Sequence, residues 1–458
     1  MRIKLDIPIS IQEVENLFVY SPSSLAPSKR LITHICTDSR ICEKGDLFFA
    51  IKGDRFDGNA FTEDARNNGC ICIASTSRFA HIQVKDTEDA LLSLATYYKS
   101  KFKNLKSSIA ITGSVGKSST KEFLKKILST KFITHANIGN YNNAIGVAHT
   151  IYSMPTKTEC LICELGMNHS GEISRMSKCI EPNLGIVTNV GTSHLGNLGS
   201  RKAIAKAKSE ITDGMKNGIV LIPYDEPLLE NIPDSIKVGY NSSTSLSQFP
   251  LIKKSLSYDY ICPDHTITDL QINLHEEHML SNLSMAIAAS MLAGLNDNEI
   301  RSGVSAIKES DLRQRFIKMR DYTIFDDSYN ASYESIAADL KYLDKQFKKA
   351  PKGVFLGDIA ELGNQSKAIH TSIGMLIPQF SISNLYLIGN YSKYIAKGAI
   401  DAGFDKSHIF INDDLNNHAL SIEQITENHL SGEIILFKGS HSSGLYEIAD
   451  ILSEKRKV

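Results

Sequence analysis

The chain has 458 residues, which at about 150 residues per domain predicts about three domains. Its 50 basic side chains nearly balance 51 acidic ones, and a net charge of −1 argues against a dedicated nucleic-acid-binding protein. The composition, 42% hydrophobic and 22% charged, is ordinary for a globular protein and excludes a disordered chain. We therefore expect a folded protein that does not bind nucleic acid.

No segment of the sequence predicts targeting to, or insertion into, a membrane. Residues 1–10 contain Asp6 and no long apolar core, which is unlike a signal peptide. Residues 279–295 are the longest apolar-rich helix candidate, but Asn282 and three serines interrupt the run. We expect a cytoplasmic protein without membrane insertion.

The eight cysteines do not predict a disulfide framework in a chain of this length. Cys160 and Cys163 form a C-x-x-C pair, but they lie within an apolar run that ends at Glu164. A metal or redox site would need a turn there, or a second pair, and the sequence has neither. We interpret both cysteines, like the alternating Cys70 and Cys72, as residues packed in buried strands.

Strand-like and helical segments alternate along the chain. Before residue 104 we expect strands at 46–51 and 70–74 and a helix at 89–103. Residues 108–112 form a short β-branched run that ends in a Gly-rich turn and is followed by a helical apolar pattern at 123–128. Further strand candidates are 160–163, 185–190, 218–222, 323–325, 353–356, 385–388 and 433–437.

This alternation is typical of an α/β fold with mostly parallel sheets covered by helices on both faces. The pattern restarts past residue 306, so we divide the chain near residues 104 and 312. Residues 1–104 would form a smaller α/β domain and residues 105–312 a central domain with a P-loop-type, mostly parallel sheet. Residues 313–458 would form a Rossmann-like domain.

The turn at residues 112–118, with the sequence T-G-S-V-G-K-S, predicts a phosphate-binding loop. Backbone N–H groups of such a turn and of the following helix N-terminus attract anions, and glycine lets the backbone approach phosphate closely. Lys117 would reach the terminal phosphates and the Ser118 hydroxyl would hold Mg²⁺. The strict Walker pattern is not met, because Ile111 stands where its first glycine belongs. The alternative is a structural turn with an exposed lysine.

Two further side chains are placed at the carboxyl ends of predicted strands. Glu164 ends the run at 160–163, where a carboxylate beside the phosphate loop could bind Mg²⁺ or simply be solvated. His194 follows the run at 185–190, and a lone histidine is more often structural. Its position at the same sheet edge favours a functional role.

Several short motifs, in one order along the chain, resemble the Mur ligases of peptidoglycan synthesis. The T-G-x-x-G-K-[ST] loop is the form that this superfamily uses. Within it the chain looks like the MurF branch, whose members add D-alanyl-D-alanine to UDP-N-acetylmuramoyl-tripeptide. The matching stretches are T-D-S-R at 37–40, G-D-L-F at 45–48, D-G at 57–58, N-Y-N-N at 140–143, E-L-G-M-N-H at 164–169, A-K-S-E-I at 207–211, D-D-S-Y-N at 326–330, G-D at 357–358 with E-L-G at 361–363, and K-G-S at 438–440.

The resemblance implies an ATP site with magnesium. The implied ATP-binding residues are Gly113, Ser114, Val115, Gly116, Lys117, Ser118, Ser119, Asn282, Arg315 and Asp327. The implied ligands of two Mg²⁺ ions are Ser118, Glu164, His194 and Lys208, of which Lys208 would be carbamylated by CO₂. Lys117, Lys208, His194 and Arg315 would be the catalytic residues. Two alternatives stay open: Lys208 could belong to a solvated helix face with Lys202 and Lys206, and Arg313 could replace Arg315.

The resemblance also implies where the other substrates bind. Ser39, Arg40, Asp57 and Gly58 would hold the UDP end, in the domain at 1–104. Asn142, Asn143, Asn168 and His169 would line the path of the muramoyl peptide, and Asn330 and Ser440 the dipeptide site in the C-terminal domain. His441 stands where this branch usually has arginine. If that arginine holds the dipeptide carboxylate, His441 would hold it less strongly unless protonated.

The implied reaction is ligation through an acyl phosphate, the last cytoplasmic step of pentapeptide precursor synthesis. The tripeptide carboxylate would attack the γ-phosphorus of ATP, and the amine of D-alanyl-D-alanine would then displace phosphate. We expect a monomer.

The nearest alternatives are a MurE-like or a folylpolyglutamate synthetase-like ligase; the D-N-P-R expected of MurE is absent. A P-loop GTPase would need N-K-x-D, also absent, and a noncatalytic module would have lost Glu164, His194 or Lys208.

Overall fold

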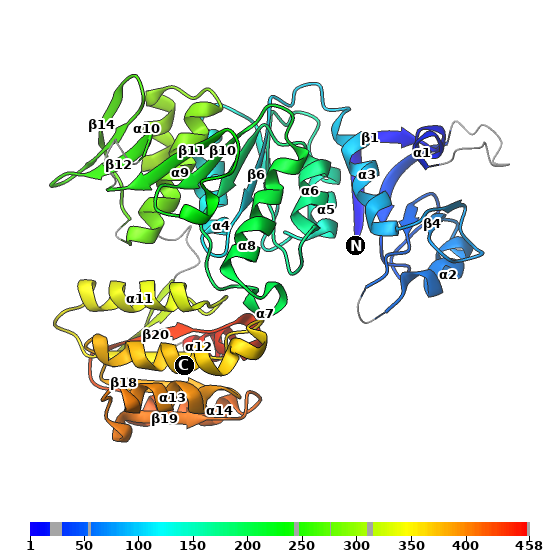
Figure 1. Ribbon diagram of the computed structural model, residues 1–458. Coiled ribbons are helices and arrows are strands. Elements are labelled where there is room, and N and C mark those ends of the chain that lie inside the picture. The colour runs from blue at the N-terminus through cyan, green and yellow to red at the C-terminus, as the bar shows by residue number, and fades with distance from the viewer. Residues whose placement is uncertain (19–29, 54–55, 242–246, 275, 309–314, 456–458) are drawn as a thin grey trace.

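The computed structural model describes residues 1–18, 30–53, 56–241, 247–274, 276–308 and 315–455 (Figure 1). In this part of the chain, three sheets of five, nine and six strands follow one another along the sequence. The predicted α/β class with mostly parallel sheets is confirmed. Of the two predicted boundaries, the one near 104 falls between the first two sheets and the one near 312 lies outside the described residues.

The N-terminal sheet has the strand order β1-β2-β3-β4-β5, in which only β1 and β2 are antiparallel. Its helix α3 begins after Asp86, whose side chain caps the first turn, and packs against helices α5 and α6 of the next sheet. It ends at Lys99, four residues before the predicted end. The elements are β1 (Arg2–Ser10), α1 (Ile11–Phe18), β2 (Leu31–Cys36), β3 (Leu47–Phe49), α2 (Thr62–Asn67), β4 (Ile71–Ala74), β5 (Ile82–Gln83) and α3 (Thr87–Lys99).

The central sheet has the order β14-β13-β12-β11-β10-β9-β6-β8-β7, with β6 between β8 and β9. The strands from β12 to β7 are parallel, and β13 and β14 add an antiparallel edge. They are β6 (Ser107–Thr112), β7 (Thr134–Ala136), β8 (Cys160–Glu164), β9 (Leu184–Val187), β10 (Ile219–Pro223), β11 (Ser235–Tyr240), β12 (Phe249–Lys253), β13 (Tyr258–Ile261) and β14 (Thr266–Leu270).

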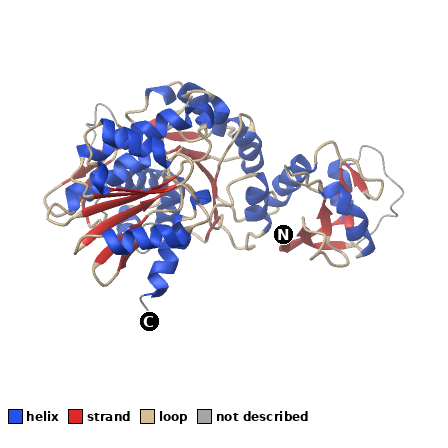
Figure 2. Ribbon diagram, turned by 90° about the horizontal axis from the view of Figure 1, so that it is seen from below, coloured by secondary structure: helices blue, strands red, loops and turns tan. Residues whose placement is uncertain are grey.

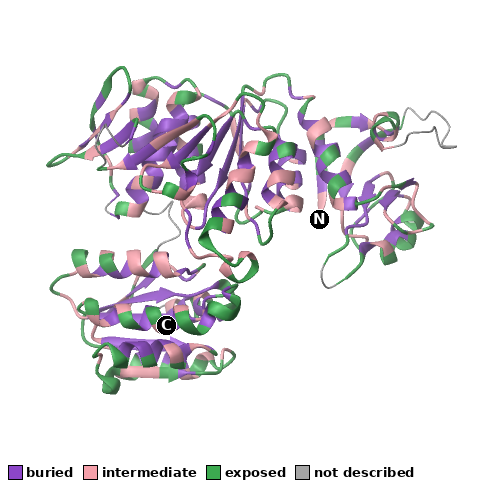
Figure 3. Ribbon diagram, viewed as in Figure 1, coloured by how far each residue is buried: buried purple, intermediate pink, exposed green. Residues whose placement is uncertain are grey.

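Helices cover both faces of the central sheet, which explains why its inner strands are continuous apolar runs. Along β6, Ile109 and Ile111 pack on the side of α4 and α9, whereas Ala110 belongs to the core beneath α5 and α6. The helices are α4 (Lys117–Leu128), α5 (Ala144–Tyr152), α6 (Glu172–Ile180), α7 (Leu195–Leu198), α8 (Arg201–Ser209), α9 (Glu277–Leu292) and α10 (Asp297–Ser305). Figure 3 shows the buried strands between these helices.

The C-terminal sheet has the order β15-β16-β20-β17-β18-β19 and is parallel except for the edge strand β15. Figures 1 and 2 show helices on both of its faces. The elements are β15 (Arg315–Lys318), β16 (Tyr322–Asp326), α11 (Tyr333–Gln346), β17 (Lys352–Gly357), α12 (Ser366–Leu376), β18 (Asn384–Ile388), α13 (Ser392–Asp401), β19 (Ile409–Asn412), α14 (His418–Asn428), β20 (Glu433–Lys438) and α15 (Leu445–Lys455).

The cysteines are structural, as the sequence predicts. All eight are buried and free, and Cys160 and Cys163 lie in β8. Burial raises the pKa of the Cys160 thiol to about 12, so that it stays protonated and unreactive. Among the described residues, no helix has the length and apolar character that crossing a membrane requires.

Candidate active site

The phosphate loop joins β6 to α4 in the middle of the central sheet. Gly116 is the N-cap of α4 and has φ +84°, a left-handed conformation that glycine adopts without strain. A Cβ at this position would lie 2.5 Å from Oδ1 of Asn282, so glycine is also required by space. Lys117 Nζ donates hydrogen bonds to the carbonyl oxygens of Gly113 at 2.8 Å and Ser114 at 3.4 Å. The loop therefore has the predicted strand–turn–helix setting, with Asn282 against it.

Glu164 lies beside this loop at the carboxyl end of β8. Its Oε2 accepts a hydrogen bond of 2.7 Å from the Ser118 hydroxyl, and its Oε1 accepts one of 3.0 Å from Asn142 Nδ2. The ammonium group of Lys121 lies 3.8 Å from Oε2. The Glu164 carboxylate is 2% exposed and is thus held by neutral donors and one neighbouring cation. Two oxygen donors suited to Mg²⁺, on Ser118 and Glu164, are in direct contact.

Lys208 is buried in α8, with 1% of its surface exposed, which excludes the solvated helix face as its location. Burial, together with the positive charge of Lys117, lowers its pKa well below the ordinary value. No hydrogen bond or ion pair of its ammonium group is formed with the rest of the described chain. The side chain therefore favours the neutral amine.

His194 precedes the short helix α7 and has φ +66°, a left-handed conformation uncommon for a residue with a side chain. Its Nδ1 forms an ion pair with Glu361 of the C-terminal part. That contact holds the pKa of Glu361 below its ordinary value despite partial burial. The Gly196 N–H also donates to the Glu361 carbonyl at 3.0 Å, so this segment links the central and C-terminal parts.

A buried lysine and two aspartates form the C-terminal side of the site. Lys438, at the end of β20, forms ion pairs with Asp327 and, at 2.9 Å, with Asp339 of α11. Lys438 is 3% and Asp339 1% exposed. Burial raises the pKa of Asp327 to about 6, with Lys438 opposing the rise and Asp339 adding to it. The Asp327–Lys438–Asp339 cluster keeps one net negative charge when both carboxylates are ionised.

A cavity of about 300 Å³ lies between the phosphate loop and this cluster. It is lined from the central part by residues 114–119, Asn140, Asn142, Glu164, Asn189, Ser193, His278, Met279 and Asn282, and from the C-terminal part by Asp327, residues 329–332, Glu334, Ser335, Ala338, Asp339 and Lys438. The carboxyl ends of strands from two sheets thus meet at one cavity. This is where ligands bind in open α/β sheets.

Several residues of the cavity were not expected from the sequence. Asn189, His278, Tyr329, Asp339 and Lys438 line it without having been assigned a role, although Tyr329 and Lys438 lie in the matching stretches at 326–330 and 438–440. Asn189 lies just past the carboxyl end of β9, and Glu164 lies at the carboxyl end of β8. Polar residues at strand ends were a signal in the sequence, and the same signal could have indicated Asn189. The pairing of Lys438 with Asp339 carried no comparable signal, because it depends on how β20 and α11 pack.

Other predicted residues lie outside the cavity lining. Arg315, 51% exposed at its side chain, donates from Nε to Asp326 Oδ2 at 2.9 Å and contacts Asp450 at 3.2 Å. Arg313 lies outside the described residues. The alternative between the two arginines therefore stays open, and Arg315 is engaged with carboxylates of its own domain.

The predicted peptide-path residues have local roles in the structure. Asn143 caps α5 by accepting the Gly146 N–H at 2.9 Å. The Asn168 N–H and the His169 ring both contact Glu172, at 2.6 and 3.2 Å, on the surface beyond the cavity.

The two residues assigned to the dipeptide side and the unusual histidine come from distant parts of the chain, which the contact between Tyr329 and His441 brings together. Asn330 lines the cavity, and Ser440 Oγ accepts the N–H of Ala360 at 2.9 Å. His441 is exposed and stacks on Tyr446, with ring centroids 4.5 Å apart, while the centroid of the Tyr329 ring lies 6.0 Å away in an edge-on arrangement. His441 thus belongs to an aromatic group that reaches the cavity through Tyr329.

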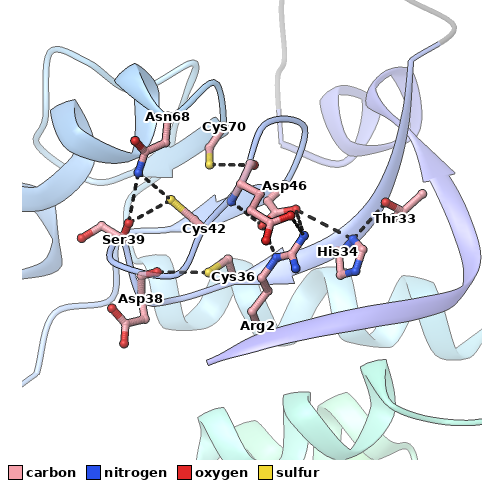
Figure 4. A network of polar contacts seen from close by, with 11 residues as sticks. Arg2, Thr33, His34, Cys36, Asp38, Ser39, Cys42, Asp46, Asn68 and Cys70 are labelled. Atoms are coloured by element: carbon pink, nitrogen blue, oxygen red, sulfur yellow. Dashed lines mark hydrogen bonds and ion pairs between the residues drawn. The ribbon is translucent and has the colours of Figure 1, made fainter.

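The residues expected to bind UDP lie in the N-terminal part and line no part of the cavity. Arg40 is exposed and pairs with Asp38 at 2.7 Å, which holds the pKa of that carboxyl at about 2. The Ser39 carbonyl accepts hydrogen bonds from Cys42 Sγ at 3.2 Å and Asn68 Nδ2 at 3.3 Å (Figure 4). Side-chain contacts of this kind order the T-D-S-R loop.

Asp57 and Gly58 form a tight structural turn in the same part of the chain. The Asp57 carboxylate accepts the Asn59 N–H at 2.9 Å, and a Cβ at Gly58 would lie 2.3 Å from the Ile51 carbonyl oxygen. Glycine is required there by the close approach of the backbone.

The loop at residues 357–363 depends on a buried histidine. His370 in α12 is 0% exposed; its Nε2 accepts the Ile359 N–H at 3.0 Å and its Nδ1 lies 2.6 Å from the Ser366 carbonyl oxygen. Both contacts together require a neutral ring with its proton on Nδ1. Burial lowers the pKa of His370, although Ser366 and Asp358 partly oppose this.

We expect this histidine to make stability depend on pH. Because the pKa in the folded protein lies below the ordinary 6.5, the unfolded chain binds more protons between the two values. The free energy of unfolding should therefore fall as the pH drops from 6.5 toward the folded pKa. Urea unfolding of wild type and His370→Gln from about pH 5 to 8 measures this, and the variant should lack that part of the slope. Equal slopes would contradict the assignment.

Comparison with known proteins decides the family. The model described as "Mur ligase family, catalytic domain" matches residues 31–126, and "Mur ligase middle domain" matches residues 111–290. The UDP-N-acetylmuramoyl-tripeptide–D-alanyl-D-alanine ligase of Bacillus subtilis is 32% identical over 437 residues, covering 93% of this chain and 94% of that protein. The protein of the same name from Rickettsia prowazekii is 33% identical over 438 residues, covering 90% and 93%. The chain belongs to the Mur ligase family.

Solved structures agree with this assignment. A crystal structure of MurF from Acinetobacter baumannii superimposes on this Mur ligase with a TM-score of 0.85 at 27% identity, covering 99% of this chain and 100% of that one. The resemblance found in the motifs is thereby confirmed over nearly the whole chain. As a member of this family, the protein is a ligase.

Proposed function

We propose that this Mur ligase joins D-alanyl-D-alanine to UDP-N-acetylmuramoyl-tripeptide at the expense of ATP. The names of relatives that match nine-tenths of the chain support this substrate pair. The observation that carries the proposal is the cavity that the phosphate loop and the Asp327–Lys438–Asp339 cluster line together. A cavity built from two domains suits a reaction in which a nucleotide and an acceptor are brought together and water is excluded.

The phosphates of ATP would bind at Gly113 and residues 114–119, where the N-terminus of α4 offers backbone N–H groups. Asn282 lies against Gly116, and Asp327 lines the other side of the cavity. Both positions support the proposal that these residues contact the nucleotide. Lys117 would turn from the carbonyl oxygens of its own loop to the phosphates. Arg315 could join them only if phosphate replaced Asp326 as its partner.

The donor set of the site fits Mg²⁺. Ser118 and Glu164 offer hard oxygen donors in mutual contact, and His194 would add nitrogen if its ion pair with Glu361 opened. A neutral Lys208 amine can add to CO₂, giving a carbamate and releasing a proton, and the carbamate would contribute further oxygens. Bound Mg²⁺ would reduce the repulsion between the anionic substrate and ATP.

The protein's own residues would act by position and charge. The substrate carboxylate must approach the γ-phosphate, and both groups are negatively charged. The positive charge of Lys117 would reduce the repulsion between them. Attack of that carboxylate on the γ-phosphorus would break the bond to the β-phosphate oxygen, giving an acyl phosphate and ADP. The amine of the dipeptide would then attack the acyl carbon, and phosphate would leave with the amine losing a proton. The hydrogen bond from the Gly196 N–H to the Glu361 carbonyl would keep the two domains closed around this intermediate.

The remaining assignments concern substrate binding and stay predictions. We place the UDP end at the N-terminal part, with Ser39, Arg40, Asp57 and Gly58, and the peptide along Asn142, Asn143, Asn168 and His169. The dipeptide would lie near Asn330 and Ser440, where His441 takes the place of the usual arginine. Asn142 and Asn330 are the members of this set that line the cavity.

Phosphate release in the presence of ATP and Mg²⁺ tests the proposal. We expect turnover with UDP-N-acetylmuramoyl-tripeptide plus D-alanyl-D-alanine and none with either substrate alone. Single amino acids, including diaminopimelate and glutamate, are the control acceptors. Turnover with one of these acceptors and not with the dipeptide would assign the enzyme to a MurE-like or folylpolyglutamate synthetase-like activity instead.

A further inference from the structure

Two N–H groups of the phosphate loop are already bonded to a side chain that lies just past the end of the neighbouring strand β9. The backbone nitrogens of Ser114 and Val115 each lie 2.9 Å from Asn189 Oδ1 and donate to it. Asn189 follows β9, the strand that pairs with β6, and it lines the same cavity as the phosphate loop. One carboxamide oxygen thus takes the place that an anion could otherwise occupy at this turn.

Residues 188–191, around Asn189, form three further hydrogen bonds with the phosphate loop. The Thr188 N–H donates to the Thr112 carbonyl at 2.9 Å, and the Gly191 N–H donates to Ser114 Oγ at 2.9 Å. The Thr188 hydroxyl donates to the Val115 carbonyl. The first half of the loop is therefore bonded to residues 188–191 through both backbone and side chains.

We propose that Asn189 is a positioning residue for the nucleotide, which holds the first half of the phosphate loop so that the second half binds phosphate. This inference rests on the proposed function, because it assumes ATP at this loop. With Ser114 and Val115 held, the N–H groups of residues 117–119 at the start of α4 remain without helical acceptors. These groups and the Lys117 ammonium then form the anion site.

The amide chemistry of Asn189 is essential to this role. A carboxamide oxygen satisfies two buried N–H donors without adding negative charge beside the phosphates. Aspartate has the same shape and would accept both bonds, but its charge would repel the nucleotide. A merely structural acceptor would tolerate aspartate, whereas a residue beside the phosphates would not.

The test compares Asn189→Ala and Asn189→Asp with a matched control, Asn183→Ala. Asn183 Oδ1 accepts the Ser108 N–H at 2.8 Å and the Ser107 hydroxyl at 3.1 Å, at the opposite end of β6. Binding of a nonhydrolysable ATP analogue with Mg²⁺ is measured by calorimetry, together with the KM for ATP and kcat. We expect Kd and KM for the nucleotide to rise about tenfold in Asn189→Ala, from the loss of two backbone hydrogen bonds.

In Asn189→Asp the nucleotide Kd should rise further, and the increase should shrink at high salt. In Asn183→Ala the nucleotide Kd should stay within about twofold of the wild-type value. Wild-type or tighter nucleotide binding by Asn189→Ala would overturn the proposal, since Asn189 would then compete with phosphate. Wild-type binding by Asn189→Asp would also overturn it, and this variant keeps the acceptor if the alanine variant does not fold. A wild-type protein that binds the analogue but does not use D-alanyl-D-alanine would contradict the proposed function alone.

Discussion

Replacing Lys438 by methionine should lower the free energy of unfolding by about 3–5 kcal/mol, because it leaves Asp327 and Asp339 buried without a cation. Methionine keeps most of the volume of the lysine side chain, so the loss reports on charge rather than on a cavity. Denaturant unfolding of the full chain, followed by circular dichroism, measures it. A loss below about 1 kcal/mol would show that the cluster is solvated.

The pH dependence of this loss separates charge from packing. Without Lys438 the pKa of Asp327 should rise above its value of about 6, since burial and Asp339 then act unopposed. The folded variant would bind more protons than the unfolded chain between the ordinary 3.8 and that raised value, so its stability should fall as the pH rises through this window. A loss independent of pH would contradict the role of charge.

Lys352→Met is the matched control. Lys352 is 2% exposed in β17 of the same sheet, but its partner Asp344, at 3.3 Å, has 37% of its side chain exposed. Water can solvate that carboxylate when the lysine is removed, so we expect a loss of about 1 kcal/mol or less.

Replacing Lys208 by alanine should reduce ligase turnover by about 100- to 1000-fold if its carbamate holds Mg²⁺ at the site. The buried side chain and its lowered pKa favour the neutral amine that reacts with CO₂. Short carboxylates such as acetate or formate could enter the vacated space and supply the lost oxygens. We therefore expect them to restore part of the activity in a phosphate-release assay.

The control for this prediction is Lys206→Ala, an exposed lysine two positions earlier on α8. It should retain wild-type turnover and should not respond to added carboxylates. Lys208→Ala with wild-type turnover would remove the carbamate from the proposal. Reduced turnover that no carboxylate restores, together with a large loss of stability, would assign Lys208 a structural role instead.

The strands that the sequence predicts are those buried on both faces. Runs such as residues 160–163 and 433–437 are continuously apolar, and both became inner strands, β8 and β20. Strands with mixed burial or few residues escaped prediction: the edge strand β14 has two buried residues among exposed ones, the edge strand β7 has three residues in all, and the inner strands β2 and β11 are only partly buried. Their positions depend on pairing with a neighbour, which the local pattern does not reveal.

The residues of the site likewise include some that local sequence predicts and others that depend on strand pairing. The phosphate loop and Glu164 are local features, each at the end of a buried strand, and the structure brings them into contact through Ser118. The partner of Arg315 is not local: antiparallel pairing of β15 with β16 sets Arg315 opposite Asp326. No spacing rule indicates that pair, and it keeps Arg315 away from the cavity lining.

By itself, then, the sequence determined the α/β class, the strand–turn–helix setting of residues 107–128 and the family, because each depends on contiguous residues whose backbone preferences and burial pattern act locally. Only the tertiary structure decided that Lys208 is buried, that Asn189 holds the loop, and that Lys438 lies between two aspartates. Sheet order is the physical reason for the last of these: β20 pairs with β16, which places Lys438 next to Asp327 although 111 positions separate them in the chain.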